Sequence, residues 1–130
     1  MKGTTGYEKE FAAMKVKESI TEGVAVLSIS GKMMGGPEQA VLHDKVRNLV
    51  SDNINWVVMD MGKVEWLNSS GLGLLMGCLA TCRGAGGDMV ISRAARKVNS
   101  VFMLTQVIKV FETYGTTEEA LEALKEKRGT

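Results

Sequence analysis

Two adjacent serines, Ser69 and Ser70, are the side chains of this sequence best placed to do chemistry. They follow an apolar run at residues 56–61, which predicts a strand covered on both faces. After the two serines, the sequence has glycines and a set of apolar residues at helical spacing. The apolar residues are Leu72, Leu75, Met76 and Leu79. The two hydroxyls are therefore expected where a strand passes into a helix. In open α/β sheets, ligands and partners are bound beyond the carboxyl ends of the strands.

Three enzyme motifs fit this segment poorly. A dinucleotide-binding fingerprint starting at Gly71 needs its third glycine at position 76, but the glycine falls at Gly77. A P-loop needs a Lys-Ser or Lys-Thr pair after a glycine at fixed spacing, and the sequence has none there. A nucleophile elbow needs a glycine two residues before the serine, where Ser69 has Leu67, and its only base would be His43. We therefore expect no catalytic residues and no enzymatic activity.

Two interpretations of the serine pair remain open. In the first, Ser69 and Ser70 only cap the helix, because serine side chains accept hydrogen bonds from free backbone N–H groups there. In the second, one of them is a regulatory phosphorylation site. A phosphoryl group at a helix N-terminus meets free N–H donors and the positive end of the helix dipole. It also adds a charge of about −1.5 to −2 to any docking surface there, which makes a binding switch.

The composition excludes several classes of protein and site. The 130 residues are 45% hydrophobic and 24% charged, which is typical of a single globular domain. The net charge of +1 gives no overall field that would hold nucleic acid or an acidic membrane. One histidine and two cysteines are too few for a structural zinc site, so we expect no metal and no cofactor. Cys78 and Cys82 are expected to pack as small apolar side chains on one face of a helix.

The chain is predicted to consist of a flexible leader at residues 1–13 and one folded domain at residues 14–127. The leader lacks a hydrophobic period, and its charged residues at 8–10 exclude a signal peptide. The longest uncharged stretch, residues 66–82, contains asparagine, serines and glycines and is too short and too polar to span a membrane. We therefore expect a cytoplasmic protein without a membrane contact.

Alternating strand and helix patterns predict an α/β domain with a mostly parallel sheet behind a leading hairpin. Thr116 and Glu119 stand at capping-box spacing, which predicts the start of a last helix. Residues 107–111 are ambiguous between a loop and an edge strand. The other expected strands are residues 15–20, 24–30, 56–61 and 89–91, with loops at 31–37 and 62–67. The other expected helices are residues 38–51, 70–83 and 95–104.

Four segments resemble the signature of STAS domains, the anti-sigma factor antagonists of bacteria. They are Val57–Met61, Val64–Gly73, Gly86–Ile91 and Val98–Phe102. The resemblance covers roughly residues 14 to 125, in the order and spacing of that family. It implies the STAS fold, a mixed sheet of four to five strands with flanking helices. It also implies a stand-alone binding protein of signal transduction and transcription regulation, and not an enzyme.

The resemblance further implies a phosphorylation switch. Unphosphorylated members bind an anti-sigma factor that is also a serine kinase with a GHKL-type ATP site, and thereby free the sigma factor. The kinase then phosphorylates the first serine of the motif, and a PP2C-type phosphatase reverses this. The matching position is Ser69, with Ser70 as the alternative. The family usually has aspartate before this serine, where this chain has Asn68, which removes one negative charge.

The partner-binding face implied by the resemblance includes the loop after the second strand. The expected contact residues are Met33, Met34, Gly35, Asn68, Ser69, Ser70, Gly71 and Leu72. The sequence leaves open whether both methionines dock or one is buried. Arg93, Arg96 and Lys97 form a small basic cluster near the same end, either a solvated face or a contact for an acidic partner or a phosphate.

A second function stays open at this point. The chain could be a non-phosphorylated accessory STAS subunit of a transport or multi-protein signalling assembly. In either case we expect a monomer when the protein is alone.

Overall fold

The computed structural model describes residues 14–94 and 101–129, which form one five-stranded sheet and four helices. The strands are β1 (Met14–Thr21), β2 (Val24–Met33), β3 (Trp56–Leu67), β4 (Asp88–Ser92) and β5 (Thr113–Tyr114). The helices are α2 (Pro37–Ser51), α3 (Ser69–Gly84), α4 (Val101–Val110) and α5 (Thr117–Arg128). The predicted leader and two members of the basic cluster, Arg96 and Lys97, lie outside the described residues.

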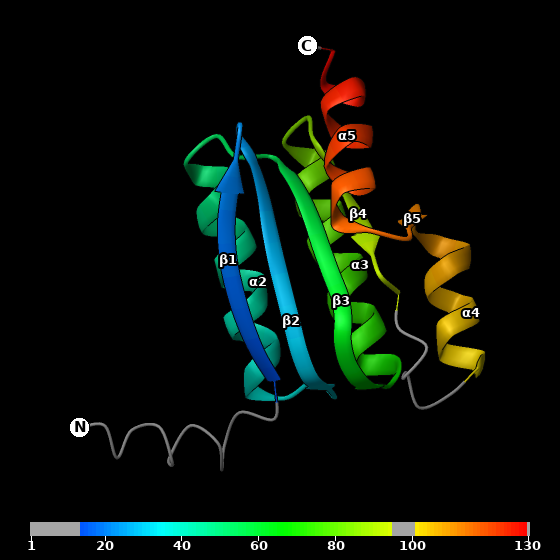
Figure 1. The fold of residues 1–130 in the computed structure, drawn as a ribbon. Coiled ribbons are helices and arrows are strands. Elements are labelled where there is room, and N and C mark those ends of the chain that lie inside the picture. The colour runs from blue at the N-terminus through cyan, green and yellow to red at the C-terminus, as the bar shows by residue number, and fades with distance from the viewer. Residues whose placement is uncertain (1–13, 95–100, 130) are drawn as a thin grey trace.

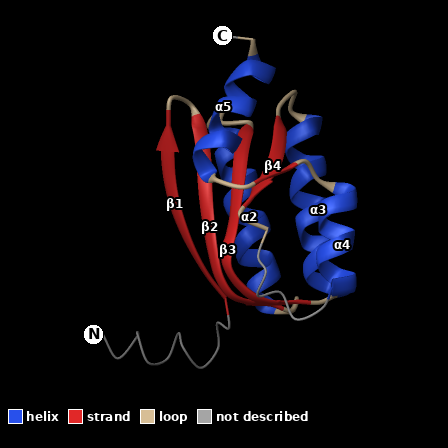
Figure 2. Cartoon of the chain, turned by 45° about the vertical axis from the view of Figure 1, so that its right-hand side comes forward, coloured by secondary structure: helices blue, strands red, loops and turns tan. Residues whose placement is uncertain are grey.

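The strands lie side by side in chain order, β1-β2-β3-β4-β5. β1 is antiparallel to β2, and each later pair of neighbours is parallel. The predicted α/β class, with a mixed sheet behind a leading hairpin, is therefore confirmed. Figure 1 looks onto the face of the sheet that α5 partly covers, with α2 and α3 behind the strands. Figure 2 shows α4 beside α3, at the end of the sheet where β3 leads into α3.

Alternation along the strands divides the buried side chains between the two faces of the sheet. On β2, Ala25, Leu27 and Ile29 face the larger core beneath α2 and α3. Val24 and Val26 face the opposite way, into a smaller core beneath α5. The other buried residues of that smaller core are Val58, Val90, Ala120 and Leu124. Each face of the central strands thus has its own helical cover, which is why these strands read as continuous apolar runs.

Strands β2 and β3 are longer than the sequence predicts. The loops expected at 31–37 and 62–67 begin later or are absent, since β2 reaches Met33 and β3 reaches Leu67. The pairing of the two strands is irregular at two places in this part. Such bulges interrupt the alternation by which a strand is recognised. The buried residues of β3 consequently recur at every third position, Met61, Val64 and Leu67.

The segment between β4 and β5 also differs from the prediction. Residues 107–111, ambiguous between a loop and an edge strand in the sequence, lie in and directly after α4. Val107 and Phe111 are both buried, four residues apart, and the N–H of Phe111 donates to the carbonyl of Val107 at 2.9 Å. The β-branched residues of this stretch hid that helical spacing. The first part of the helix expected at 95–104 lies outside the described residues, and Phe102, expected in its apolar stripe, is 63% exposed.

The last helix, α5, begins with the predicted capping box. Thr116 Oγ1 accepts the N–H of Glu119, and Glu119 Oε1 accepts the N–H of Thr116. At its other end, Arg128 donates to the carbonyl of Glu22 at 2.9 Å and Lys125 pairs with the Glu22 carboxylate at 3.0 Å. α5 therefore holds the turn of the β1–β2 hairpin.

Candidate functional site

The candidate site lies where two parallel strands end together. Met33 closes β2 and pairs in register with Leu67, the last residue of β3. α3 begins only two residues later, at Ser69. All eight residues expected at the partner-binding face therefore belong to this one corner of the sheet.

Asn68 is the residue that fixes the corner. Its Oδ1 accepts the N–H of Gly71 at 2.9 Å and thereby caps α3, in place of the serines that could have done so. Its Nδ2 donates to the carbonyl of Met34 at 3.2 Å, and its backbone N–H donates to the carbonyl of Met33 at 3.3 Å. One side chain thus connects the helix N-terminus to the chain that leaves β2.

Gly71 permits the close approach of α3 to β2. A Cβ atom at this position would collide with the backbone carbonyl of Met33 and lie 2.8 Å from the side chain of Leu67. Gly73, two residues later, has no heavy atom within 4 Å of such a Cβ. The requirement for glycine therefore belongs to position 71, where the helix presses on the strand end.

Ser69 and Ser70 are both exposed and form the first turn of α3. Because Asn68 provides the cap, their hydroxyls are not needed for it, and the interpretation in which the serines themselves cap the helix is wrong. Within the described residues, no hydrogen bond uses the backbone N–H of Ser69 or Ser70. The first turn also holds no acidic residue. No acidic side chain of that turn therefore offsets the positive end of the helix dipole beside the two exposed hydroxyls.

The two methionines of the loop have opposite environments. Met33 is 1% exposed and packs in the larger core, whereas Met34 is 48% exposed. Gly35 is buried with a positive φ of 83°. Of the three, only Met34 offers its side chain to a partner, and Met33 acts through its carbonyl.

Sequence reasoning missed two exposed apolar residues near the serines. Trp66 lies in β3 three residues before Ser69, and Met76 lies on the outer side of α3 at 45% exposure. The sequence pattern places Met76 in the buried stripe of the helix, and this is wrong. The buried positions are Gly71, Leu74, Leu75, Cys78, Leu79 and Cys82. Because Met76 and the neighbouring Leu75 are both hydrophobic, the sequence does not show which of the two faces the core.

A serine–histidine pair is not present at this corner. His43 of α2 faces the middle of α3, where its Nε2 lies 3.1 Å from Thr81 Oγ1. Thr81 stands twelve residues after Ser69, on the order of 18 Å along a helix. A general base must come within hydrogen-bonding distance of the group it deprotonates, so His43 does not activate Ser69 in this arrangement.

Other groups that could do chemistry lie in inert surroundings. Cys78 and Cys82 are buried, as expected, and burial raises the pKa of both thiols to about 12. In the described part of the chain, no three His, Cys, Asp or Glu side chains are grouped closely enough to hold a metal ion. None of the helices described is long and apolar enough to cross a membrane.

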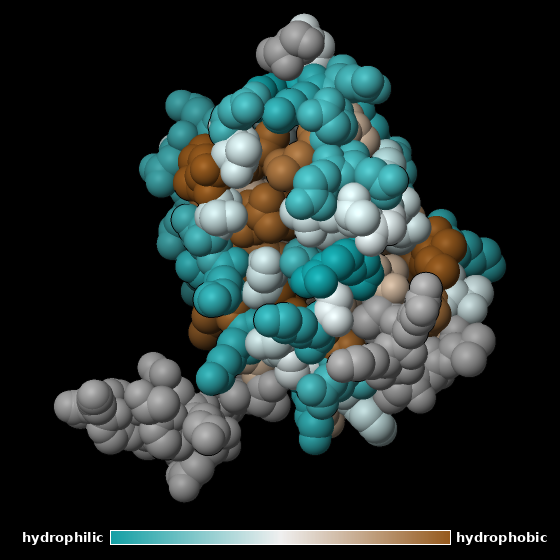
Figure 3. Space-filling view, viewed as in Figure 1, coloured by the Kyte–Doolittle hydropathy of each residue, from teal (hydrophilic) through white to brown (hydrophobic). Residues whose placement is uncertain are grey.

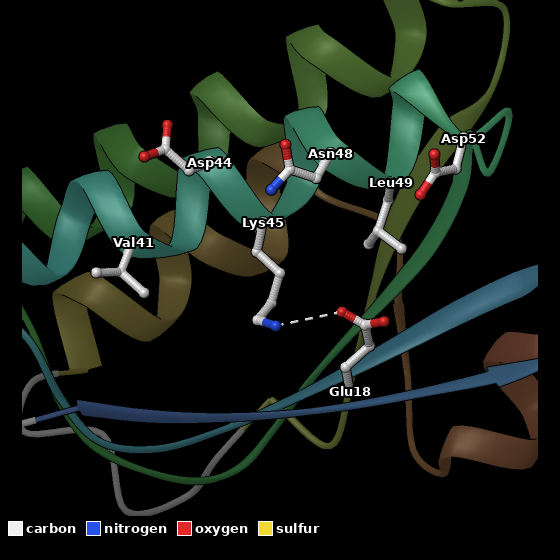
Figure 4. A pocket seen from close by; sticks show the side chains of 7 residues that line it. All are labelled: Glu18, Val41, Asp44, Lys45, Asn48, Leu49 and Asp52. Carbon is white, nitrogen blue, oxygen red and sulfur yellow. Dashed lines mark hydrogen bonds and ion pairs between the residues drawn. The ribbon is translucent and has the colours of Figure 1, made fainter.

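A separate groove lies at the β1 edge of the sheet, between β1 and α2 (Figure 4). It has a volume of about 390 Å³. Lys45 of α2 extends across it to Glu18 of β1, with a distance of 3.3 Å between Nζ and Oε1. None of the residues expected at the partner-binding face lines this groove, so it is not part of the candidate site.

Comparison with known families identifies the fold. The model of the STAS domain matches residues 15–120. This match covers most of the chain, and the chain belongs to the STAS domain family.

Solved structures share this fold. An anti-sigma factor antagonist from Mycobacterium paratuberculosis is 27% identical, with a TM-score of 0.65 over 86% of this chain and 94% of that one. A proposed anti-sigma factor antagonist from Thermotoga maritima is 21% identical, with a TM-score of 0.70 over 85% and 94%. The phosphorylated form of the Bacillus cell fate determinant SpoIIAA is 16% identical, with a TM-score of 0.62 over 85% and 98%.

Proposed function

We propose that this STAS domain protein is an anti-sigma factor antagonist that is switched by phosphorylation of Ser69. In its unphosphorylated form it binds an anti-sigma factor with GHKL-type serine kinase activity and so releases the sigma factor. The kinase ends this complex by phosphorylating Ser69, and a PP2C-type phosphatase restores the binding form. The protein acts by binding and carries out no chemical step of its own, in the cytoplasm of a bacterium.

The observation that carries the proposal is the environment of Ser69. Its hydroxyl is exposed at the start of α3, the helix is already capped by Asn68, and the first turn of the helix contains no acidic residue. A kinase can therefore reach the hydroxyl without unfolding the helix. The phosphoryl group then meets the free N–H groups of the first turn, which stabilise an anion.

The same group would oppose binding of the partner. Met34, Trp66 and Met76 provide exposed apolar side chains around the strand ends and the outer side of α3. A partner that packs on these side chains removes water from Ser69 as well. Burying a phosphoryl charge without a matching cation is costly, so phosphorylation weakens the complex while the fold stays intact.

The test uses purified GHKL-type serine kinases from the same genome, with ATP, and four forms of this chain. Ser69→Ala should fold, bind the kinase partner and gain no phosphoryl group by intact-mass spectrometry. Ser69→Asp should also fold, because a helix N-terminus favours an anion. By titration calorimetry, it should bind at least about tenfold more weakly than the parent, which corresponds to about 1.4 kcal/mol.

Ser70→Ala is the matched control and should still be phosphorylated. Labelling of Ser69→Ala but not of Ser70→Ala would move the site to Ser70. If neither serine is labelled and Ser69→Asp binds like the parent, the switch does not exist in this chain. The accessory STAS subunit of a transport or signalling assembly would then be the better account.

A further inference from the structure

A row of polar side chains crosses the sheet on the face that carries α5. The strand register pairs Lys17 with Ser28, Ser28 with Asp60, and Asp60 with Ser92. Aspartate is disfavoured inside strands, and here it stands at the centre of the sheet, in β3, with its side chain buried. A buried carboxylate in this place needs partners that offset the cost of its burial.

This polar row lies where α5 stops covering this face of the sheet. On one side of it, Val24, Val26 and Val58 are packed under α5. On the other side the same face continues with Ser30 and Lys63, which form a pair in the register of β2 and β3. In Figure 3, hydrophobic side chains gather in the upper part of this face near α5, and hydrophilic side chains lie across the part below. No described helix covers that lower part of the sheet in Figure 1.

A cavity of about 230 Å³ opens on this uncovered half. Its lining comes from four consecutive segments of the sheet: Lys17 of β1, Ser28, Ile29 and Ser30 of β2, Asp60 and Lys63 of β3, and Arg93 after β4. Neither Ser69 nor Ser70 lines it. It is therefore a site of its own, distinct from the corner at the start of α3.

Each oxygen of the Asp60 carboxylate in the cavity accepts two hydrogen bonds. Asp60 Oδ1 accepts from the N–H of Gly62 at 3.0 Å and from Arg93 Nε at 2.8 Å. Asp60 Oδ2 accepts from Ser28 Oγ at 3.2 Å and from Arg93 Nη2 at 2.9 Å. Burial by itself raises the pKa of Asp60, but the hydrogen bonds from Arg93, Gly62 and Ser28 outweigh it and hold that pKa below its usual value.

Arg93 is held in place from two sides. Its backbone adopts a left-handed conformation, with φ at 53°, and its N–H donates to the carbonyl of Tyr114 at 2.9 Å. Gly62 leaves room for the guanidinium, because a Cβ at position 62 would overlap it. The edge of the guanidinium that carries Nη1 has no bond to Asp60, and the side chain remains 45% exposed. It can therefore offer further donors to a ligand.

The cations of the cavity exceed its anions. Lys17, Lys63 and Arg93 give three positive charges, and Asp60 gives one negative charge, so the lining carries 3 − 1 = +2. Within the described residues, neither Lys17 nor Lys63 forms an ion pair or a hydrogen bond through its ammonium group. The hydroxyl of Ser30 adds a donor without a charge. A surplus of two charges with free donors matches a dianion.

We propose that this cavity binds a phosphate dianion, either free inorganic phosphate or the phosphoryl group of a small phosphomonoester. Lys17 and Lys63 approach it from β1 and β3, the strands on either side of β2, and the free edge of Arg93 supplies a planar donor pair. Arginine favours such planar contacts with phosphate oxygens. The cavity volume of about 230 Å³ lies below the roughly 300–1,000 Å³ that is usual for drug-sized ligands, and a phosphoryl group fits within it.

In the test, the full chain is titrated with phosphate at constant ionic strength. Its backbone amide NMR spectrum is recorded at each phosphate concentration. Sodium phosphate should cause saturable shifts at residues 28–30, 60–63 and 93, whereas sodium chloride should not. The double variant Lys17→Gln/Lys63→Gln should weaken binding at least about tenfold, because two charge-assisted contacts are lost. The spectrum of each variant also shows whether it is folded.

Lys109→Gln is the control, since it removes a positive charge from α4, outside the cavity. It should bind phosphate like the parent. Glycerol phosphate distinguishes the two sources of the ligand: binding equal to that of phosphate indicates a phosphomonoester, and weaker binding indicates the free anion. Shifts that do not saturate, or that change equally in Lys109→Gln and the double variant, would overturn the proposal.

Discussion

The side-chain amide of Asn68 and the backbone carbonyl of Met34 lie 3.2 Å apart, in a hydrogen bond that joins the start of α3 to the chain leaving β2. The other end of the same amide accepts the N–H of Gly71. An aspartate at position 68 could accept from Gly71, but it has no N–H for the carbonyl of Met34. Asparagine therefore couples the position of the exposed Met34 to the helix turn that carries Ser69.

Two substitutions at position 68 should separate these contacts. Asn68→Asp loses the bond to Met34, which is worth about 0.5–1.5 kcal/mol, and gains a favourable charge at the helix N-terminus, worth about 0.3–1 kcal/mol. Its free energy of unfolding should therefore stay within about 1 kcal/mol of the parent. Asn68→Ala loses both contacts and should cost about 1–2 kcal/mol. Urea denaturation measures both, and an equal loss for the two variants would show that the cap contributes nothing.

Gly71→Ala should destabilise the protein by about 1–3 kcal/mol, because its methyl group collides with the carbonyl of Met33 and overpacks the contact between α3 and β2. Gly73→Ala is the matched control in the same helix. Its methyl group meets open space, and replacing a helical glycine should stabilise the protein by about 0.5–1 kcal/mol. Thermal denaturation should therefore shift in opposite directions for the two variants. A stabilising effect at both positions would mean that α3 does not press on the strand end.

Leu75→Ala should cost about 2–5 kcal/mol, because Leu75 is fully buried in the larger core and its truncation leaves a cavity. The neighbouring Met76 is exposed, and Met76→Ala should change stability by less than about 0.5 kcal/mol. Chemical denaturation of the pair tests the rotation of α3 about its axis. Similar losses for both would contradict the buried face described above.

The stability should fall in acid through Asp60 and Asp88. Burial alone raises the pKa of each, but hydrogen bonds, mainly from Arg93 to Asp60 and from Lys127 to Asp88, lower both below the usual value. In the unfolded chain an aspartate titrates near pH 3.9. The stabilisation from these carboxylates is therefore present above that pH and is lost as the pH falls through it toward the lower folded values.

Asp60→Asn provides the test of this pH dependence. Its urea midpoint should be lower than that of the parent at neutral pH and should change less between about pH 5 and pH 3. Glu126→Gln, a change at an exposed carboxylate outside these networks, should leave the slope as in the parent. An unchanged slope in Asp60→Asn would show that the pair with Arg93 does not stabilise the fold.

The sequence predicts the elements whose pattern is local. The strand–helix order, the capping box of Thr116 and Glu119, and the burial of Leu75 and Leu79 all follow from spacing along the chain. The exposed serines at the start of α3 follow in the same way. Local patterns fail where a bulge changes the alternation, as in the second half of β3, and where apolar residues surround a helix, as at Met76.

The polar row of the sheet could not be predicted from the sequence. Asp60 and Arg93 are 33 residues apart, and nothing in their neighbourhoods marks them as partners. Their contact depends on the register of β3 with β4 and on the left-handed backbone of Arg93. Likewise, the bond from Asn68 to the carbonyl of Met34 depends on the two parallel strands ending together. Such contacts arise from topology, which a single sequence does not show.

The attachment of α5 to the hairpin turn has a consequence for how the domain folds. The bond from Arg128 to the carbonyl of Glu22 spans 106 residues of sequence. Contacts between such distant residues must pay a large loop-closure entropy before they stabilise anything, and proteins rich in them fold more slowly than helical bundles. During synthesis on a ribosome, the β1–β2 hairpin is made well before α5. Until α5 is made, Val24 and Val26, on the face of β2 that α5 covers, stay exposed to solvent. Newly made chains are therefore most vulnerable to aggregation in the interval before α5 docks.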